Sequence, residues 1–219
     1  LSSDKVLIEI FRNGRDIHSA VASKVFGVAE SEVTKEMRRR AKVINFGIVY
    51  GMGVNSLKKN LGSTMEEAQT FYDNFFKQFP KIQDYFDRVK NQARVKGYTT
   101  TAYGRRRYFP MINSSLPFVR SEAERMAVNA PIQGTATADL IKMAMQKVDA
   151  VLKKENLDGE ARLLLQVHDE LLYEIKEWES VDMVVVLIKS TMENVDKLPV
   201  PLIVNASLGD SWGELVLYK

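Results

Sequence analysis

Two cations and two aromatic residues recur at intervals of four in the segment RRRAKVINFGIVYG. Arg38, Lys42, Phe46 and Tyr50 therefore share one face if the segment is an α-helix. Arginine and lysine neutralise phosphate oxygens, and aromatic rings offer a surface to a base and a sugar. This face suits a nucleoside triphosphate. The alternative is an amphipathic helix whose cations are solvated and whose aromatic rings belong to the core.

A polar triplet, His168-Asp169-Glu170, separates two apolar runs in LLLQVHDELLYEI. Two apolar strands joined by this turn would expose the carboxylate of Asp169 on a rigid hairpin. Mg²⁺ prefers oxygen ligands and keeps room for water and substrate phosphates, so this carboxylate is a candidate magnesium ligand. Aspartate is also common in turns because it bonds to the nearby backbone, and a purely structural role is the alternative.

The segments that position these residues differ in hydrophobic patterning along the chain. The predicted helices span residues 34–50, 64 onward, 80–97 and 119–152, the last with interruptions at Pro131 and Gly134. Residues 98–102 are β-prone, and the final third predicts strands over 162–167, 171–175 and 202–208, with a helix before the last. A mainly helical part followed by an α+β part is therefore expected.

Composition sets broad limits on the class of protein. The 219 residues are 45% hydrophobic, which is enough for one large or two small cores. The absence of cysteine excludes disulfides, a thiolate nucleophile and the usual structural zinc sites. A net charge of +3 does not by itself indicate nucleic-acid binding. Without a membrane-spanning stretch or a secretory signal, we expect no membrane partner and a cytoplasmic protein, with an organellar location as the alternative.

The helix that carries the cationic and aromatic face resembles the fingers-helix motif of family A DNA polymerases. That motif is Arg, three residues, Lys, three residues, Phe or Tyr, and three residues before Tyr-Gly, and the chain meets it without a gap. The resemblance implies that Arg38 and Lys42 hold the triphosphate of an incoming dNTP, with Lys42 also catalytic. It implies Phe46 against the sugar and base and Tyr50 near the templating position. A phenylalanine at this place implies discrimination against dideoxynucleotides.

The sequence Gln-Val-His-Asp-Glu resembles the polymerase motif whose aspartate binds the catalytic metals. The resemblance implies that Asp169 is a metal ligand, that His168 contacts the primer end and that Glu170 is a more peripheral acid of the catalytic site. In two-metal nucleotidyl transfer, one Mg²⁺ activates the 3′-hydroxyl and both stabilise the charge on the transferred phosphate. One aspartate cannot hold two ions. The second ligand is expected outside this chain, since nothing in it matches the family's Asp-Tyr-Ser-Gln-Ile-Glu-type motif.

Other segments match the same family, so the resemblance extends over essentially the whole chain. The segment Gly-Arg-Asp-Ile-His implies that His18 donates a hydrogen bond to the triphosphate. The segment that ends in Asn-Ala-Pro-Ile-Gln-Gly implies that Arg125, Asn129 and Gln133 contact primer-template DNA. Without the family match, His18 would be a structural histidine and the other three would be the polar face of a helix.

The chain departs from the family pattern at residues 133–139. The family usually reads Gln-Gly-Thr-Ala-Ala-Asp, whereas this chain reads Gln-Gly-Thr-Ala-Thr-Ala-Asp, one residue longer. An added residue turns the rest of a helix by about 100° unless a bulge absorbs it.

The Gly104-Arg105-Arg106-Arg107 segment also matches a family turn. Contact with phosphate and a solvated or internally paired turn are both open for these arginines.

Together these features predict an α+β fold, with a helical fingers subdomain followed by part of a palm made of an antiparallel sheet and packing helices. Fingers would occupy most of residues 1–125, with residues near the amino terminus joining the palm, and residues 126–219 would form the carboxyl-terminal palm. The implied function is DNA-templated DNA synthesis from dNTPs on primer-template DNA, with two Mg²⁺ ions. It requires polymerase segments outside the chain, namely the first metal motif and the thumb, so the isolated chain is expected to be inactive. The resemblance also implies a bacterial or phage-like protein.

Two alternatives to this function stay open at the level of sequence. One is a non-catalytic module that binds nucleotides or DNA, which the lack of the first metal motif favours. The other is a single-subunit RNA polymerase or reverse transcriptase with a related palm. The glutamate that would select the sugar lies in the motif that this chain does not contain.

Overall fold

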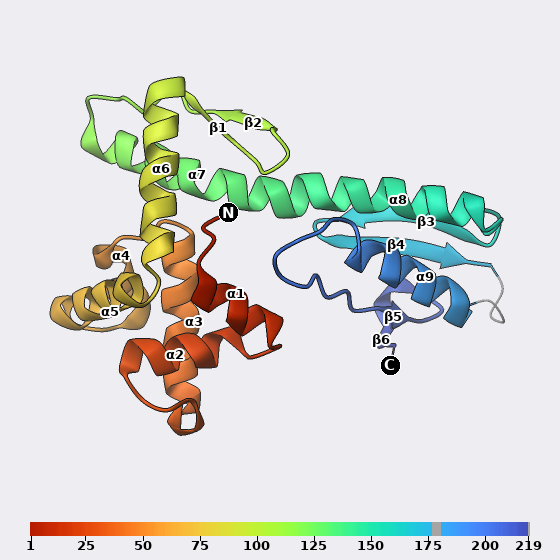
Figure 1. Cartoon of the computed structure of the whole chain (residues 1–219), viewed down its shortest axis with the longest axis horizontal. Helices are drawn as coiled ribbons and strands as arrows, with labels where there is room; N and C mark the ends of the chain where they lie inside the picture. Colours follow the sequence, from red (N-terminus) through yellow and green to blue (C-terminus); the bar gives the residue numbers. More distant parts are fainter. Residues whose placement is uncertain (177–180, 219) are drawn as a thin grey trace. The chain divides into compact units, whose positions relative to one another are not determined.

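The computed structural model describes residues 1–176 and 181–218 (Figure 1). The chain divides into two compact units, which we call unit 1 (Leu1–Gly134) and unit 2 (Thr135–Lys219). The described part of unit 1 is helical with one small hairpin, whereas that of unit 2 combines helices with antiparallel strands. The predicted α+β fold class is confirmed.

Unit 1 begins with closely spaced helices. In chain order they are α1 (Lys5–Arg12), α2 (Ile17–Phe26), the 3₁₀ turn η1 (Glu30–Glu32), α3 (Lys35–Val49), α4 (Val54–Leu61), α5 (Met65–Gln78), α6 (Pro80–Lys96) and, after a hairpin, α7 (Pro117–Gln133). The boundaries follow from capping chemistry. Thr34 opens α3 by accepting a hydrogen bond from the backbone N–H of Met37 at 3.2 Å. Thr64 and Glu67 form a reciprocal capping box at the start of α5. The predicted helices at 34–50, 64 onward and 80–97 are confirmed.

The core of unit 1 holds α3 by one side only. Ala41, Ile44 and Ile48 of α3 are fully buried, and they belong to a cluster that includes Phe75 of α5 and Phe79 at the α5–α6 junction. Large aromatic side chains contribute most of the apolar area buried in such a core. Because the buried face of α3 is anchored in this way, the opposite face is left at the surface.

The small hairpin of unit 1 consists of β1 (Tyr98–Thr100) and β2 (Arg106–Tyr108), paired in antiparallel register from Tyr98↔Tyr108 to Thr100↔Arg106. The guanidinium of Arg106 lies 4.8 Å from the centre of the Tyr98 ring, and that of Arg107 lies 5.5 Å from the Phe109 ring. Cations at these distances are attracted by the face of an aromatic ring. Arg106 and Arg107 thus contact aromatic rings within unit 1, and contact of this turn with phosphate stays a prediction.

Helical structure continues without a loop from α7 through a π-helical segment, η2 (Gly134–Leu140), into α8 (Ile141–Lys154). A π-helical turn accommodates one more residue than an α-helical turn, so η2 absorbs the residue by which this chain exceeds the family pattern. The expected interruption lies here, while Pro131 lies inside α7. Gly134 is required sterically, since a Cβ at this position would lie 2.6 Å from the Cγ2 of Thr101.

Unit 2 packs a hairpin against two helices. Its described elements are α8, β3 (Ala161–Val167), β4 (Glu170–Ile175), α9 (Val181–Glu193), β5 (Ser207–Leu208), the 3₁₀ turn η4 (Trp212–Glu214) and β6 (Val216–Leu217). The core joins Val148 and Leu152 of α8 to Ala161 of β3 and Val184 of α9. The strands predicted at 162–167 and 171–175 are confirmed to within one residue.

The third predicted strand, over residues 202–208, is wrong for most of its length. Only β5 is a strand there, and it pairs with β6 through Ser207↔Leu217 and Leu208↔Val216. Before it, the backbone N–H of Val204 donates to the carboxylate of Glu193 instead of to a neighbouring strand. An apolar run without a strand partner does not form a β-ladder. No helix within the described residues is long and apolar enough to cross a membrane.

Candidate functional site

The exposed face of α3 presents the four residues that recur at intervals of four. Arg38, Lys42, Phe46 and Tyr50 are all exposed, the two aromatic side chains to 47% each. The rings of Phe46 and Tyr50 are stacked, with centroids 6.5 Å apart, and the Lys42 Nζ lies 6.0 Å from the Phe46 centroid. The reading in which these aromatic rings belong to the core is therefore wrong. We call these four residues the α3 face.

Helix α2 brings His18 to the α3 face. Its ring centroid lies 5.4 Å from that of Phe46, and its Nδ1 is buried with no hydrogen-bond partner in the described structure. Burial, aided by the positive charges of Arg38 and Lys42, lowers the pKa of His18 below its ordinary value, and the carboxylate of Asp16 partly opposes that effect. The neutral imidazole is therefore favoured near pH 7, with a nitrogen that has yet to be satisfied.

Asp16 connects the start of α2 to the α3 face. As N-cap of α2, it accepts a hydrogen bond from the backbone N–H of Ser19 at 2.7 Å through Oδ1. The same carboxylate accepts two bonds from Arg38, one from Nε at 3.0 Å and one from Nη2 at 2.7 Å. The Arg38 guanidinium is the main cause that holds the pKa of Asp16 well below its usual range. Asp16 is therefore ionised throughout the neutral range.

Gly51 lets the end of α3 lie against α7. Its φ of +74° is in the left-handed region that favours glycine, and a Cβ there would lie 3.2 Å from the Cα of Arg125. Any other residue here would strain the backbone and would press its Cβ against Arg125. The close approach sets Tyr50, at the end of the α3 face, beside the part of α7 that carries Arg125.

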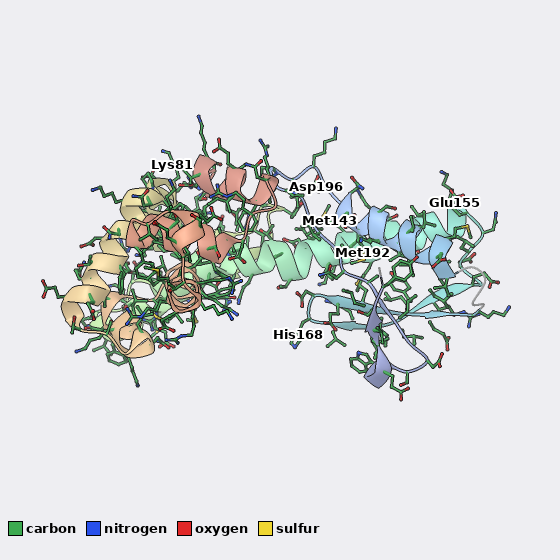
Figure 2. The ribbon with its side chains drawn as sticks, turned by 90° about the horizontal axis from the view of Figure 1, so that it is seen from below. Lys81, Met143, Glu155, His168, Met192 and Asp196 are labelled. Atoms are coloured by element: carbon green, nitrogen blue, oxygen red, sulfur yellow. The ribbon has the colours of Figure 1, made fainter. Side chains whose placement is uncertain are left out.

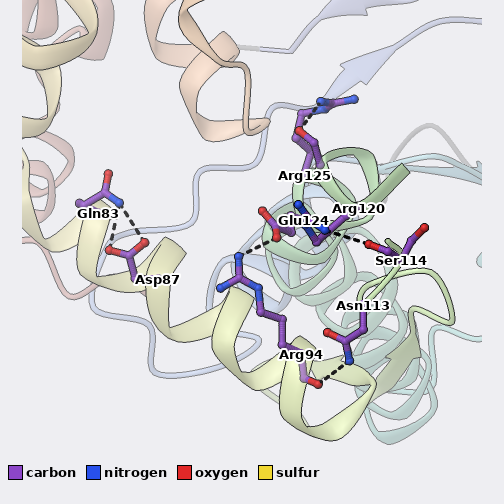
Figure 3. A network of polar contacts seen from close by, with 9 residues as sticks. Gln83, Asp87, Arg94, Asn113, Ser114, Arg120, Glu124 and Arg125 are labelled. Carbon is purple, nitrogen blue, oxygen red and sulfur yellow. Dashed lines mark hydrogen bonds and ion pairs between the residues drawn. The ribbon is translucent and has the colours of Figure 1, made fainter. Parts of the chain in front are cut away.

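Arg125, Asn129 and Gln133 recur at intervals of four along α7 and so lie on one side of this helix. Arg125 is exposed, and its Nη1 donates to the Ser121 hydroxyl at 3.3 Å (Figure 3). The Oδ1 of Asn129 is buried and has no hydrogen-bond partner in the described structure. A buried amide oxygen without a partner is costly, which is compatible with a group that is satisfied only when a ligand binds.

Other charged side chains of α7 already make contacts within unit 1, so they are less available to a ligand than Arg125. Arg94 of α6 forms an ion pair with Glu124 at 2.6 Å, and Arg120 donates to the backbone oxygen of Ser114 at 2.9 Å (Figure 3). Arg125 lies next to this network, and its own contact is with a hydroxyl on the same helix. The polar side of α7 thus contains both structural pairs and an arginine that lacks a carboxylate partner among the described contacts.

The hairpin of β3 and β4 carries the predicted metal-binding triplet. Val167 pairs with Glu170, so His168 and Asp169 alone form the turn and Glu170 is already the first residue of β4. All three side chains are exposed, and Figure 2 shows His168 at the end of the hairpin. His168 has a φ of +55°, which is uncommon for a residue with a side chain, and its backbone oxygen accepts from Gln166 Nε2 at 3.2 Å. A strained residue in an exposed turn is compatible with a functional role.

Asp169 and Glu170 supply the right kind of donor for magnesium but too few donors. Both are carboxylates at an exposed turn, as a hard cation requires. Within residues 1–176 and 181–218, no group of three or more histidine, aspartate or glutamate side chains is arranged to hold a metal ion. By themselves, these two carboxylates provide only some of the oxygen ligands that a magnesium ion takes.

The family model for DNA polymerase family A matches residues 1–214. This chain belongs to DNA polymerase family A. The assignment agrees with the resemblance seen in the α3 face and in the β3–β4 hairpin, and it covers both units.

Relatives of this family A chain include the thermostable DNA polymerase I of Thermus aquaticus, 45% identical over 97% of this chain. The DNA polymerase I of Mycobacterium tuberculosis is 47% identical over the same share. The chain spans about a quarter of the length of these relatives (25% and 23%). A solved structure of the POL domain of Pol1 from M. smegmatis, in complex with DNA primer-template and dNTP, superposes with a TM-score of 0.85 at 46% identity. It covers 92% of this chain and 35% of the solved one.

Two features of this family A chain were missed at the level of sequence. The pairing of Asp16 with Arg38 joins residues 22 positions apart and has no periodic signal, although an aspartate before a helix could have been read as an N-cap. The close approach of Gly51 to Arg125 depends on how α3 packs against α7. Sequence patterning identified Gly51 only as a helix stop.

Proposed function

We propose that this chain forms the dNTP-binding fingers and the carboxyl-terminal part of the palm of a DNA-templated DNA polymerase. The observation that carries the proposal is the α3 face, where two cations and two stacked aromatic rings are exposed on a helix whose other side is fully buried. Membership of family A supports it. The fingers would correspond to most of residues 1–125 and the palm portion to residues 126–219.

In this proposal the α3 face selects and holds the incoming dNTP. Arg38 and Lys42 neutralise triphosphate oxygens, and His18 donates a hydrogen bond to one of them. Lys42 also stabilises the negative charge that develops on the transferred phosphate, which makes it catalytic. Phe46 packs against the sugar and base, and Tyr50 lies near the templating base. The stacking of the two rings and their exposure support these roles.

The β3–β4 hairpin would supply one side of the catalytic centre. Asp169 would hold Mg²⁺, His168 would contact the primer end and Glu170 would be a more peripheral acid. Bound Mg²⁺ stabilises negative charge on the phosphate and lowers the pKa of the attacking hydroxyl. The hairpin keeps the Asp169 carboxylate at a fixed, exposed place, which is what a ligand shared with substrate phosphates requires. A second aspartate would come from the first metal motif, outside this chain.

DNA binding is proposed for the polar side of α7 and for His168. Arg125, Asn129 and Gln133 share one side of the helix, and the unsatisfied Oδ1 of Asn129 would accept a hydrogen bond from the nucleic acid. A polymerase domain of similar structure was solved with DNA primer-template and dNTP. Its 46% identity to this chain supports the same two ligands here.

The uncovered surface of β3 supports the need for further polymerase segments. Leu163, Leu164 and Leu165 are all exposed, and the pairing of β3 with β4 is irregular between Leu163 and Leu165. Three successive exposed leucines on a strand of a two-stranded sheet are characteristic of a surface that another segment covers. We propose that the segment with the first metal motif pairs or packs here and that a thumb completes the enzyme. The relatives named above come from the bacteria Thermus aquaticus and Mycobacterium tuberculosis, and a bacterial cytoplasmic location is proposed for this chain as well.

Primer extension tests the proposed function. We define the complete polymerase as the polypeptide that contains this chain together with the first metal motif. With primer-template, dNTPs and Mg²⁺, we expect the complete polymerase to extend the primer and the isolated 219-residue chain not to. The lack of a three-ligand metal cluster in the described residues favours a second candidate for the isolated chain, a module that only binds nucleotide or DNA. Extension by the isolated chain would contradict that candidate, and failure of the complete polymerase would contradict the main proposal.

A further inference from the structure

One carboxylate links the two helices that carry the α3 face and His18. Asp16 caps α2 through a bond from the Ser19 N–H at 2.7 Å, and it accepts both Nε and Nη2 of Arg38 on α3. The pair is bidentate, so it fixes the plane of the guanidinium as well as its distance from α2. Lys42 offers no comparable contact to a carboxylate in the described structure. Among the α3-face cations, Arg38 is thus the one whose orientation is set from a second helix.

The bonds to Asp16 leave the other edge of the Arg38 guanidinium available. A guanidinium has five N–H donors, of which the two bonds to Asp16 use one on Nε and one on Nη2. The remaining donors, on Nη1 and Nη2, form the opposite edge of the fork. The Arg38 side chain is 47% exposed, so that edge is open to a ligand. Two oxygens of a phosphate can accept hydrogen bonds from this edge while Asp16 stays bonded to the Nε edge of the guanidinium.

Nearby charges show why Arg38 needs such a partner. Arg38 and Lys42 both affect the titration of His18, so the three groups gather in one small region of positive potential. Without a counter-ion, an exposed and flexible arginine would turn away from Lys42 into water. The carboxylate of Asp16 lies within the same region and offsets this repulsion.

We propose that Asp16 is a positioning residue, which holds Arg38 against the start of α2 so that its free guanidinium edge meets the triphosphate of the incoming dNTP. The inference rests on the proposed function, because it requires that Arg38 binds the triphosphate. Asp16 itself does not contact the nucleotide in this scheme. At about pH 8, where the test is made, His18 is neutral whether or not Asp16 is charged, so the effect of Asp16 is transmitted through Arg38 alone.

The stability of the chain depends little on this ion pair, which makes the inference testable. Both side chains are nearly half exposed, and exposed ion pairs contribute little to folding. Asparagine is as good an N-cap as aspartate. Asp16→Asn therefore keeps the start of α2, and with it His18, but removes the charge that holds Arg38. The Arg39–Glu36 pair on α3 is a matched control, since it is also bidentate, at 2.7 and 2.6 Å, and exposed.

The test measures kcat and the KM for dNTP in the complete polymerase. We expect Asp16→Asn to raise KM about three- to tenfold and to leave kcat within about twofold, because lost ground-state binding appears in KM. Glu36→Gln should change neither. In an Arg38→Ala background, Asp16→Asn should add no further increase in KM. With Arg38 present, Asp16→Glu should raise KM less than Asp16→Asn does, since glutamate keeps the negative charge. Thermal melting should show that Asp16→Asn and Glu36→Gln are folded alike.

The outcomes separate this inference from the function on which it rests. If Arg38→Ala leaves the dNTP KM unchanged, Arg38 does not bind the triphosphate, so the proposed role of Arg38 and the inference that rests on it are both wrong. If Arg38→Ala raises KM but Asp16→Asn does not, or if Asp16→Asn still raises KM in the Arg38→Ala background, the positioning role is wrong and the proposed function stands. A decrease in KM for Asp16→Asn would also overturn the inference, because Asp16 would then compete with the triphosphate for Arg38.

Discussion

The α3 face and the β3–β4 hairpin differ in how many candidate site residues each brings together within this chain. His18 and the four α3-face residues come from two helices within 33 positions of sequence, and a shared core holds those helices together. The hairpin supplies one turn with two adjacent acids, and its strand β3 leaves three leucines uncovered. In the proposed function, the groups that bind the triphosphate lie on neighbouring helices of this chain, whereas the metal site takes its second aspartate from a segment outside it.

The largest expected effect separates the hairpin from the α3 face. Asp169→Ala in the complete polymerase should lower kcat about a thousandfold, since a metal ligand contributes several kcal/mol to stabilising the transition state and each 1.4 kcal/mol is tenfold. Single-turnover primer extension at saturating dNTP and Mg²⁺ measures it. Glu174→Ala is the control, because it removes an exposed carboxylate from the same hairpin and should leave kcat unchanged. Near-normal extension by Asp169→Ala would show that the hairpin is structural.

A smaller effect, on binding, is expected from the α3 face. Lys42→Ala should raise the KM for dNTP about ten- to a hundredfold, because it removes a charge-assisted hydrogen bond to the triphosphate, and it should also lower kcat, because Lys42 stabilises charge on the transferred phosphate. Steady-state kinetics with varied dNTP measure it. Lys35→Ala removes another exposed lysine from the same helix, outside the α3 face, and should have little effect. Equal effects of the two substitutions would mean that general positive charge, and not the α3 face, attracts the nucleotide.

The sugar end of the α3 face can be tested without altering its charge. Phe46→Tyr should increase the incorporation of dideoxynucleotides relative to dNTPs by about tenfold, since the added hydroxyl can contribute a hydrogen bond near a sugar that lacks its own. The Phe46 side chain is 47% exposed, so the hydroxyl fits without disturbing the core. Competition between the two substrates in one reaction measures the ratio. An unchanged ratio would mean that Phe46 does not face the sugar.

Sequence patterning predicted the elements of this chain better than their contacts. Helix α3, the capping box at Thr64 and the strands on either side of Asp169 follow from local periodicity and turn chemistry, and the structure has them. The strand predicted over 202–208 was wrong because pairing depends on a partner strand, which short apolar runs do not reveal. The added residue at 133–139 predicted either a bulge or a helix turned by about 100°. The sequence could not show which of the two occurs, so the π-helical segment itself was not predicted.

For the candidate site too, the sequence predicted which residues share a face but not which residues from different helices meet. Intervals of four placed Arg38, Lys42, Phe46 and Tyr50 on one face, and the structure has that face exposed. Periodicity could not show that Asp16 would meet Arg38, because this contact depends on how α2 crosses α3. The roles of these residues in binding and catalysis stay predictions, since they depend on ligands and on segments beyond this chain.

The smallest expected effect concerns the proton of His18, and it again distinguishes the α3 face from the hairpin. Burial holds the pKa of His18 below its ordinary value of 6.5, with Asp16, Arg38 and Lys42 as its charged neighbours. A bound triphosphate adds negative charge and should raise this pKa, so dNTP binding should tighten a few-fold as pH falls from about 8 to about 6. NMR titration of the imidazole with and without dNTP measures the shift, and His168 on the hairpin serves as the internal comparison.

Protonation of His18 should strengthen dNTP binding but lower the stability of the fold. Because the pKa of His18 is lower in the folded chain than in the unfolded chain, the unfolded state binds the proton more readily. The contribution of neutral His18 to stability is therefore complete above pH about 6.5 and declines as pH falls through the folded-state pKa. His18→Gln should weaken both the pH dependence of dNTP binding and the acid dependence of unfolding. If dNTP binding in His18→Gln keeps the full pH dependence of the parent polymerase, the proton belongs to another group, such as the triphosphate itself, and the predicted coupling of His18 to dNTP binding is wrong.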